Sequence, residues 1–332
     1  MEENLLNINE MLPKVTIMIP TYNQENFISD AIKSALEQDY ENLEIVISDD
    51  NSSDRTSEIA QGFLSDGRVK YFKNVKNIGR VANYHKTLYE HSTGDWIVNL
   101  DGDDYYTDPA FISRAMNRIL SQENIVCYFG LRYMPDKLKS HKKMLIDTDC
   151  YVFNGKFYLC HFFEIGRFSH LVTLYKKELC LIDNKCYTYQ GLQSDFHGII
   201  RYCVHGNIIV AKENKYIWRV HGENASHSMD YKNKLKDELL CQNLIMEDVK
   251  DYYSADEIKD WLKKGEKWAK NDYMVSRLQN CSGFKTLILG LIHFNWSRNY
   301  TIIYIKSLLL TLFRVNLFRK NDRLGKKLPL DY

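Results

Sequence analysis

Residues 43–54 (LEIVISDDNSSD) and residues 99–104 (NLDGDD) decide how this chain folds. Each stretch contains or ends an apolar, β-branched run that stops abruptly at carboxylates, and such runs are typical of strands covered on both faces. When two parallel strands end this way, their carboxylates meet at the edge where open α/β sheets bind ligands. Close carboxylates repel one another, so the pattern indicates a cation. A divalent metal that carries a polyphosphate fits best.

The composition is that of an ordinary globular protein. The chain has 332 residues, 45% of them apolar and 26% charged, and its net charge of +1 gives no indication of nucleic-acid binding. None of the eight cysteines forms a CxxC pair, so neither a zinc site nor a disulfide framework is predicted. Residues 1–14 (MEENLLNINEMLPK) are partly acidic and lack the apolar core of a secretion signal, which predicts a cytoplasmic protein with free thiols.

Strand and helix patterns alternate through the first hundred residues. Residues 15–19 and 69–72 read as further short strands, and apolar spacing predicts helices at 25–38, 54–64 and 81–90. This alternation is typical of right-handed βαβ units, so we expect an α/β fold with a mostly parallel central sheet flanked by helices.

The rhythm changes after residue 108. Strands are predicted at 125–131 and 171–176, a helix at 194–205, and a strand-turn-strand segment at 207–220. From about residue 229 onward the composition is helical and charged.

Two apolar runs near the C-terminus, residues 286–292 and 300–313, are too short to span a bilayer, which takes about 20 residues. Lysines and arginines surround both runs, a composition typical of amphipathic helices that lie in an anionic membrane interface. The alternative is a helical subdomain packed on the rest of the protein.

Three motifs occur in order: VTIMIPTYNQ at 15–24, EIVISDDNSSD at 44–54 and LDGDD at 100–104. Together they resemble the inverting family 2 glycosyltransferases of GT-A fold, many of which build bacterial polysaccharides. The resemblance covers about residues 14–225. It implies a Rossmann-like GT-A fold of the nucleotide-diphospho-sugar transferases.

The resemblance also implies a domain organisation. We expect a catalytic domain at residues 1–228, with a nucleotide-binding half at about 14–105 and an acceptor half at about 106–228. A C-terminal helical, membrane-associating region is expected at residues 229–332.

Nucleotide contacts are implied at the ends of the first two strands. Pro20, Thr21 and Tyr22 match the family's first nucleotide-contacting loop. Either Asp49 or Asp50 is expected to accept a hydrogen bond from the uracil ring, a task that suits a carboxylate because it only accepts. The alternative for this turn is capping of the next helix.

A divalent metal, Mn²⁺ or Mg²⁺, is implied at the DxD motif of residues 101–103. Asp103 is expected to bind the metal directly. Asp101 either bonds the ribose or sugar or holds the metal through water. Asp104 either adds to the metal site or caps the following turn.

Two basic residues complete the donor site that the resemblance implies. Arg80 either approaches the nucleotide or its phosphates or is an ordinary surface arginine. His221 belongs to a run that resembles a late family motif closing over the pyrophosphate. It either ligates the metal, bonds a phosphate or lies in a surface loop.

An inverting transfer needs a base that takes the proton from the acceptor hydroxyl. In the family this base is an aspartate at a helix start, often preceded by glutamate, and Asp195 matches the position although Ser194 replaces the glutamate. The alternative is an N-cap for the helix.

We therefore expect a glycosyltransferase that moves a hexose or N-acetylhexosamine from a UDP-sugar by metal-dependent direct displacement with inversion. The expected acceptor is a saccharide, polyprenyl-linked, in O-antigen or capsule synthesis. The enzyme would lie on the inner face of the cell membrane as a peripheral protein.

Two other functions agree with parts of this pattern. A sugar-nucleotide nucleotidyltransferase would carry a Gly-rich loop after the first strand, where this chain has PTYNQ at 20–24. A non-catalytic carbohydrate-binding protein on the same fold is disfavoured by the intact LDGDD motif and by Asp195.

Overall fold

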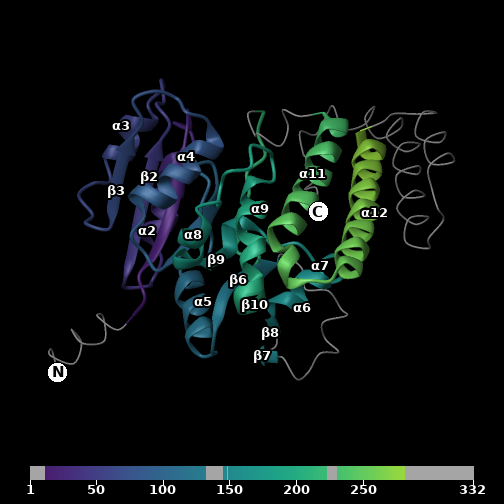
Figure 1. Ribbon diagram of the computed structural model, residues 1–332. Coiled ribbons are helices and arrows are strands. Elements are labelled where there is room, and N and C mark those ends of the chain that lie inside the picture. Colours follow the sequence, from purple (N-terminus) through teal and green to yellow (C-terminus); the bar gives the residue numbers. More distant parts are fainter. Residues whose placement is uncertain (1–11, 132–144, 148, 223–229, 281–332) are drawn as a thin grey trace, which may run out of the picture. The chain divides into compact units, whose positions relative to one another are not determined.

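The computed structural model describes residues 12–131, 145–147, 149–222 and 230–280 (Figure 1). The chain divides into two compact units, one of Met1–Ser228 with Asp237–Gly265 and one of Met229–Lys236 with Glu266–Tyr332. The domain boundary predicted after residue 228 stays a prediction. The apolar runs predicted to bind membrane lie outside the described residues.

A nine-stranded sheet forms the centre of the first unit, in the order β3-β2-β1-β4-β9-β6-β10-β8-β7. Seven of these strands point one way and two, β9 and β8, run against them, so the predicted mostly parallel sheet is confirmed. The strands are β1 (Val15–Thr21), β2 (Leu43–Asp49), β3 (Val69–Lys73), β4 (Trp96–Asn99), β6 (Ile125–Leu131), β7 (Leu145–Asp147), β8 (Cys150–Asn154), β9 (Thr173–Lys176) and β10 (Asn207–Lys212).

The parallel strands β1 and β2 end level with each other, and β4 ends beside Met18 of β1, short of that level. Both β1 and β2 are buried along their whole length, as their unbroken apolar runs predict. The register pairs Thr21 with Asp49 and Met18 with Asn99. Whatever follows the carboxyl ends of these strands is therefore brought to one edge of the sheet.

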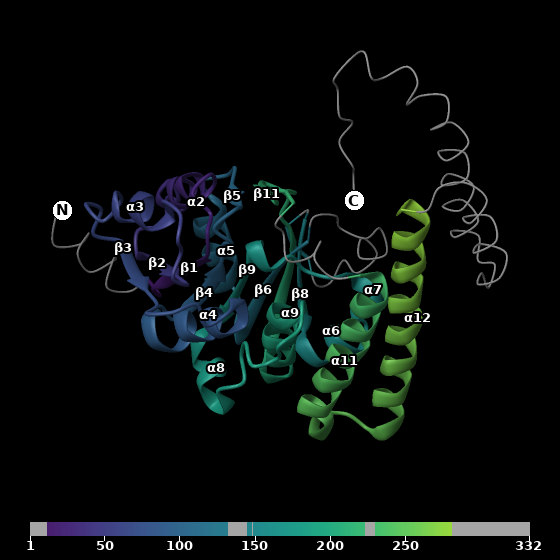
Figure 2. The ribbon, with the colours of Figure 1, turned by 90° about the horizontal axis from the view of Figure 1, so that it is seen from above.

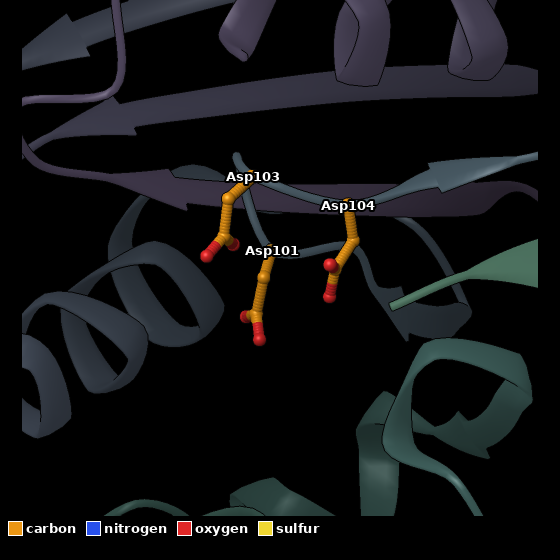
Figure 3. Close-up of side chains that lie close together, drawn as sticks. All are labelled: Asp101, Asp103 and Asp104. Atoms are coloured by element: carbon orange, nitrogen blue, oxygen red, sulfur yellow. The ribbon is translucent and has the colours of Figure 1, made fainter. Parts of the chain in front are cut away.

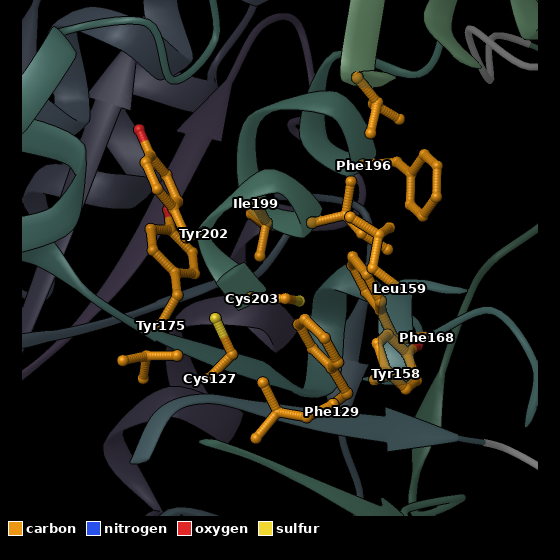
Figure 4. Packing of buried hydrophobic residues seen from close by; sticks show 14 of the residues in the cluster. Cys127, Phe129, Tyr158, Leu159, Phe168, Tyr175, Phe196, Ile199, Tyr202 and Cys203 are labelled. Atoms are coloured by element: carbon orange, nitrogen blue, oxygen red, sulfur yellow. The ribbon is translucent and has the colours of Figure 1, made fainter. Parts of the chain in front are cut away.

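Helices cover both faces of the sheet (Figure 2). One face carries α2 (Ile28–Leu36), α3 (Thr56–Gln61) and α5 (Phe111–Leu120). Their apolar side chains share one core with alternate residues of β1 such as Ile17 and Ile19. The helices on the other face, where Met18 points, are α4 (Arg80–Lys86), η1 (Thr87–His91), α6 (Gly155–Cys160), α7 (Phe162–Ile165), α9 (Ser194–Ile200) and η5 (Arg201–His205). Figure 4 shows the aromatic packing of this second core, in which Phe129 stacks on Phe168 at 4.2 Å between ring centroids.

The carboxylate of Asp54 lies at the start of α3. Asp54 accepts hydrogen bonds from the Thr56 amide at 2.9 Å and from the Glu25 amide at 3.0 Å. The helix therefore starts at Thr56, two residues later than the pattern predicts, and the loop after β1 is tied to the loop after β2.

The second half of the first unit inserts a reversed strand into the sheet. β9 lies antiparallel between β4 and β6, with Val98 opposite Leu174. The strand β9 was predicted but its direction was not. Because it runs against β4, the short 3₁₀ helix η4 (His170–Val172) that precedes it lies near the carboxyl end of β4.

Further elements follow the sheet. α8 (Lys177–Asp183) comes directly after β9, and the two-residue strands β5 (Tyr105–Tyr106) and β11 (Tyr216–Ile217) pair with each other. The chain continues through α11 (Tyr231–Val249), η6 (Lys250–Tyr252) and α12 (Ala255–Asn280). None of the described helices combines the length and the apolar character that crossing a membrane requires.

Glu44 holds the parallel strands together at the edge opposite to their carboxyl ends. Its carboxylate accepts hydrogen bonds from Thr16 at 2.8 Å, from Thr93 and from Lys70 at 2.5 Å, and Lys14 lies 3.1 Å away. Burial alone would raise the pKa of Glu44, but these hydrogen bonds outweigh it and lower the pKa to about 2.

We expect Glu44→Gln to lower the free energy of unfolding at pH 7 by about 2 kcal/mol, because the charged hydrogen bonds to two lysines are lost. Since the folded-state pKa lies below the ordinary value of 4.5, this stabilisation is complete above that pH and is lost as the pH falls toward about 2. Urea unfolding between pH 7 and pH 3 measures it.

Glu58→Gln is the matched control. Glu58 pairs with Arg55 on the exposed surface of α3, so its loss is expected to change the urea midpoint little. Equal midpoints for the Glu44 and Glu58 variants at pH 7 would contradict the role given to Glu44.

Candidate active site

Three carboxylates meet just beyond the carboxyl end of β4. Oxygen atoms of Asp101, Asp103 and Asp104 lie within 4.8 Å of one another. Figure 3 shows the three side chains pointing to the same side of the turn. Gly102 permits this tight turn, since a Cβ there would lie 2.2 Å from Gln24 Oε1 and 2.9 Å from Thr21 Oγ1. The turn is thus pressed against the end of β1.

Each acidic side chain of this triad has a partner from another element. Asp101 accepts a hydrogen bond from the Tyr84 hydroxyl, and its other oxygen lies 3.0 Å from His170 Nε2. His221 Nε2 lies 2.8 Å from Asp103. Asp104 Oδ1 accepts a hydrogen bond from the backbone amide of Arg219 at 2.8 Å.

One oxygen of Asp104 is buried without a hydrogen-bond partner in the described structure. Burial, and then repulsion by Asp101 and Asp103, raises the pKa of Asp104 to about 8. Burial, and then repulsion by Asp101, also raises the pKa of Asp103. An unpartnered buried oxygen within a cluster of hard oxygen ligands fits a divalent cation such as Mn²⁺ or Mg²⁺.

His221 lies beside the triad in a fixed position. Its ring stacks on Phe27 with 4.7 Å between centroids, and the side chain of the neighbouring Arg219 reaches Asp30 on α2. The stacked ring places an imidazole nitrogen on Asp103, which is compatible with either predicted role at the metal or the phosphates.

The two aspartates at the end of β2 are buried and close the turns around them. Asp49 accepts from the Ser52 amide at 2.7 Å and from the Tyr71 hydroxyl at 2.6 Å. Asp50 accepts from the backbone amides of Ile78 and Gly79, both at 2.8 Å. Asp50 also accepts from Asn74 Nδ2 at 3.0 Å. The nucleotide contact expected for one of the two aspartates stays a prediction.

The other residues predicted to contact the nucleotide surround this edge. Pro20 and Thr21 are buried at the end of β1, whereas Tyr22 is 47% exposed. Arg80 begins α4 and donates from Nη2 to the carbonyl of Gly191 at 2.9 Å. Its side chain therefore reaches the loop that precedes the predicted base.

The predicted base, Asp195, is the second residue of α9. Gln193 occupies the N-cap, and it makes no side-chain capping bond. The structure thus does not use Asp195 as the N-cap. Instead its carboxylate lies 3.1 Å from Nδ1 of His170, the same ring whose Nε2 meets Asp101.

Charge around this ring sets the ionisation of both residues. Burial would lower the pKa of His170, but Asp101 and Asp195 raise it well above its ordinary value. Burial would raise the pKa of Asp195, but His170, and then Arg80 and Arg167, hold it well below its usual range. Asp195 is therefore ionised.

Three contacts fasten the loop that leads into α9. Asp237 accepts from the Leu192 amide at 3.0 Å and from the Tyr189 hydroxyl at 2.6 Å, and Arg167 donates to the side chain of Gln193. Together with the contact from Arg80, these bonds fix where the helix that carries Asp195 begins.

Sequence reasoning missed His170 and Tyr84, which touch the acidic triad from η4 and α4. The signal for Tyr84 was its place on the predicted helix after β3. The signal for His170 was weaker: it directly precedes a predicted strand, and it meets Asp101 because that strand runs antiparallel to β4.

Comparison with known proteins identifies relatives of the part of the chain that forms most of the central sheet. Residues 16–186 match the family model described as Glycosyl transferase family 2. A GalNAc(5)-diNAcBac-PP-undecaprenol beta-1,3-glucosyltransferase of Campylobacter jejuni is 35% identical over 115 residues, which cover 34% of this chain and 35% of the relative. The uncharacterized glycosyltransferase EpsJ of Bacillus subtilis is 33% identical over 140 residues, covering 40% of each chain. The matches thus span well under half the length of these relatives.

Solved structures share the fold at low sequence identity. Residues 1–349 of S. aureus TarS in complex with UDP-GlcNAc superpose with a TM-score of 0.58 at 16% identity, covering 89% of this chain and 79% of that one. The mannosyltransferase PcManGT from Pyrobaculum calidifontis, in complex with GDP-Man and Mn²⁺, gives 0.57 at 15% identity, covering 92% and 89%.

Proposed function

This chain belongs to glycosyl transferase family 2, and from that premise we propose that it transfers a hexose or N-acetylhexosamine from a UDP-sugar to a saccharide with inversion. It is a glycosyltransferase of GT-A fold. The observation that supports the proposed chemistry is the meeting of the acidic triad with Asp195 through one histidine ring at a single edge of the sheet.

The donor would bind with its diphosphate at the acidic triad. Asp103, Asp104 and His221 are the residues that would hold Mn²⁺ or Mg²⁺, and Asp101 would bond the ribose or sugar or hold the metal through water. When bound, the metal supplies positive charge that stabilises the diphosphate as it leaves. The buried, unpartnered oxygen of Asp104 supports this assignment.

The nucleotide would lie between the ends of β1 and β2. Pro20, Thr21 and Tyr22 would line the base, and one of Asp49 or Asp50 would accept from the uracil N–H. The UDP-GlcNAc complex of TarS, which shares the fold, suggests a UDP-sugar. The GDP-Man complex of PcManGT makes GDP-sugars the second class to test.

The reaction follows from the position of Asp195. An acceptor hydroxyl gives its proton to the carboxylate of Asp195 while its oxygen forms a bond to C1 of the sugar. The bond from C1 to the phosphate oxygen breaks, and UDP leaves with the electron pair. The attack comes from the face opposite to the leaving group, so an α-linked donor gives a β-linked product.

We propose a lipid-linked saccharide as acceptor, in the synthesis of a bacterial surface polysaccharide such as O-antigen or capsule. The name of the Campylobacter jejuni relative describes an undecaprenol-diphosphate-linked acceptor, which supports this class. The basic and apolar residues of 284–318 support a peripheral place at the inner face of the membrane.

Sugar transfer is tested by UDP release from a panel of UDP- and GDP-sugars, with and without Mn²⁺ and an added polyprenyl-diphosphate-linked saccharide. We expect turnover with a UDP-sugar that requires Mn²⁺ or Mg²⁺. Asp195→Asn is expected to lower kcat at least about 100-fold, because the acceptor's proton loses its base, while UDP-sugar affinity is retained.

Asp183→Asn is the control for this substitution. Asp183 is also ion-paired, with Arg201, but it lies on α8 outside the site. Its variant is expected to keep the wild-type kcat. A near-normal kcat for Asp195→Asn would contradict the assignment of Asp195 as the base. UDP release at the same rate with and without a divalent metal would contradict the proposed metal site.

Membrane association is tested by flotation of the full chain with lipid vesicles. We expect the protein to float with phosphatidylglycerol-containing vesicles and to dissociate in about 0.5 M NaCl, because salt screens the contact between basic side chains and anionic lipid. Vesicles of phosphatidylcholine alone are the control. Equal flotation with both lipids, or with neither, would contradict the proposal.

A further inference from the structure

His170 occupies a singular position between the two halves of the site. Nε2 lies 3.0 Å from Asp101 Oδ2, and Nδ1 lies 3.1 Å from Asp195 Oδ2. The ring is 24% exposed and the carboxylate of Asp195 is 20% exposed, so the contact is largely shielded from water. One side chain thus joins a carboxylate of the acidic triad to the predicted base.

The position of His170 follows from the topology of the sheet. β9 runs antiparallel to β4, so the residues before β9 lie beside the residues after β4. His170 precedes β9 and Asp101 follows β4, which brings them together although they are 69 residues apart in the chain. The ring therefore lies on the short helix η4, directly before a strand of the central sheet.

The two contacts also determine the charge of the His170 ring. A neutral imidazole donates from one nitrogen only, whereas a ring between two carboxylates donates from both and is an imidazolium. Its positive charge separates Asp101 from Asp195, which would otherwise repel each other. The loop before α9 is fixed by Asp237, Arg167 and Arg80, but those contacts are made to its backbone and to the side chains of Tyr189 and Gln193.

We propose that His170 is a positioning residue, which orients the carboxylate of Asp195 by holding Oδ2 and so presents Oδ1 to the acceptor hydroxyl. The inference rests on the proposed function and deepens it. His170 acts through Asp195 and touches neither the sugar nor the acceptor. In the transfer step the proton moves from the acceptor oxygen to Asp195 Oδ1, and the imidazolium keeps both of its protons.

The test compares His170→Gln with the wild type in two measurements. Without the ring, the carboxylate of Asp195 is free to rotate, and we expect kcat for sugar transfer to fall about 100-fold, a loss typical of a misplaced catalytic group. The affinity for UDP with Mn²⁺, measured by calorimetry, is expected to change less than about threefold, because misplacing the base acts on the transition state and not on donor binding.

A pH profile separates this role from a merely structural one. His170, Arg80 and Arg167 are the cations that face Asp195 and hold its pKa low. Removing the nearest cation raises that pKa, so the acid limb of kcat is expected to move to higher pH in His170→Gln. His197→Gln is the matched control. His197 lies on α9 together with Asp195, and it pairs with Asp248 of α11 at 3.3 Å. Its loss is expected to leave the acid limb of kcat unmoved.

A double variant completes the test. If His170 acts through Asp195, His170→Gln is expected to add little to the loss already caused by Asp195→Asn. Independent, multiplied losses would overturn the proposal, as would an unchanged kcat in His170→Gln or a loss of UDP affinity as large as the loss of rate.

Two further outcomes are distinguishable. Loss of the melting transition in both His170→Gln and His170→Asn would overturn the proposal by making His170 a folding residue. A wild-type protein that releases no UDP from any UDP-sugar would refute the proposed function itself, whereas wild-type turnover that survives in His170→Gln refutes only the role of His170.

Discussion

Repulsion between carboxylates at the end of β4 is the constraint on which the rest of the site depends. Asp101, Asp103 and Asp104 have oxygens within 4.8 Å of one another, and burial strengthens their repulsion. The protein compensates in part with His170, His221 and the Arg219 amide. The buried oxygen of Asp104 keeps no such partner in the described structure, which is why a divalent cation fits there.

The sheet supplies this arrangement at two levels. Parallel strands β2, β1 and β4 run toward one edge, with Glu44 fastening their opposite ends. The short helix η4, which precedes the reversed strand β9, brings His170 to the same edge from a distant part of the chain. Through the His170 ring, the acidic turn after β4 is thus joined to Asp195 at the start of α9.

Local sequence predicted the strands of the first half and where they end. Apolar runs that stop at Asp49 and Asp101 are visible in the chain, and parallel pairing follows from the alternation of strand and helix. The same signal could not show that Asp49 and Asp50 are already bonded to Tyr71 and to the amides near Gly79, because those partners come from another strand and its loop.

The acceptor half could be predicted only in part. Asp195 was predicted from its resemblance to the family motif and stays a prediction, whereas the place of His170 depends on the direction of β9, which local sequence does not encode. The contacts of Asp237 and Arg167 to the loop before α9 bridge 45 and 26 residues. Such long-range contacts leave no periodic pattern in the chain, so they emerge only once the fold is known.

The central claim is that the acidic triad binds a divalent ion that in turn holds the diphosphate of the donor. Electron-nuclear double resonance of Mn²⁺ in the presence of UDP measures this most directly, when the spectrum is compared with that of Mn²⁺ and UDP without protein. The account predicts a Mn²⁺ spectrum that carries phosphorus-31 coupling, differs from the protein-free spectrum, and returns to the protein-free spectrum in Asp103→Asn. A spectrum that is the same with the wild type, with Asp103→Asn and with no protein would contradict it.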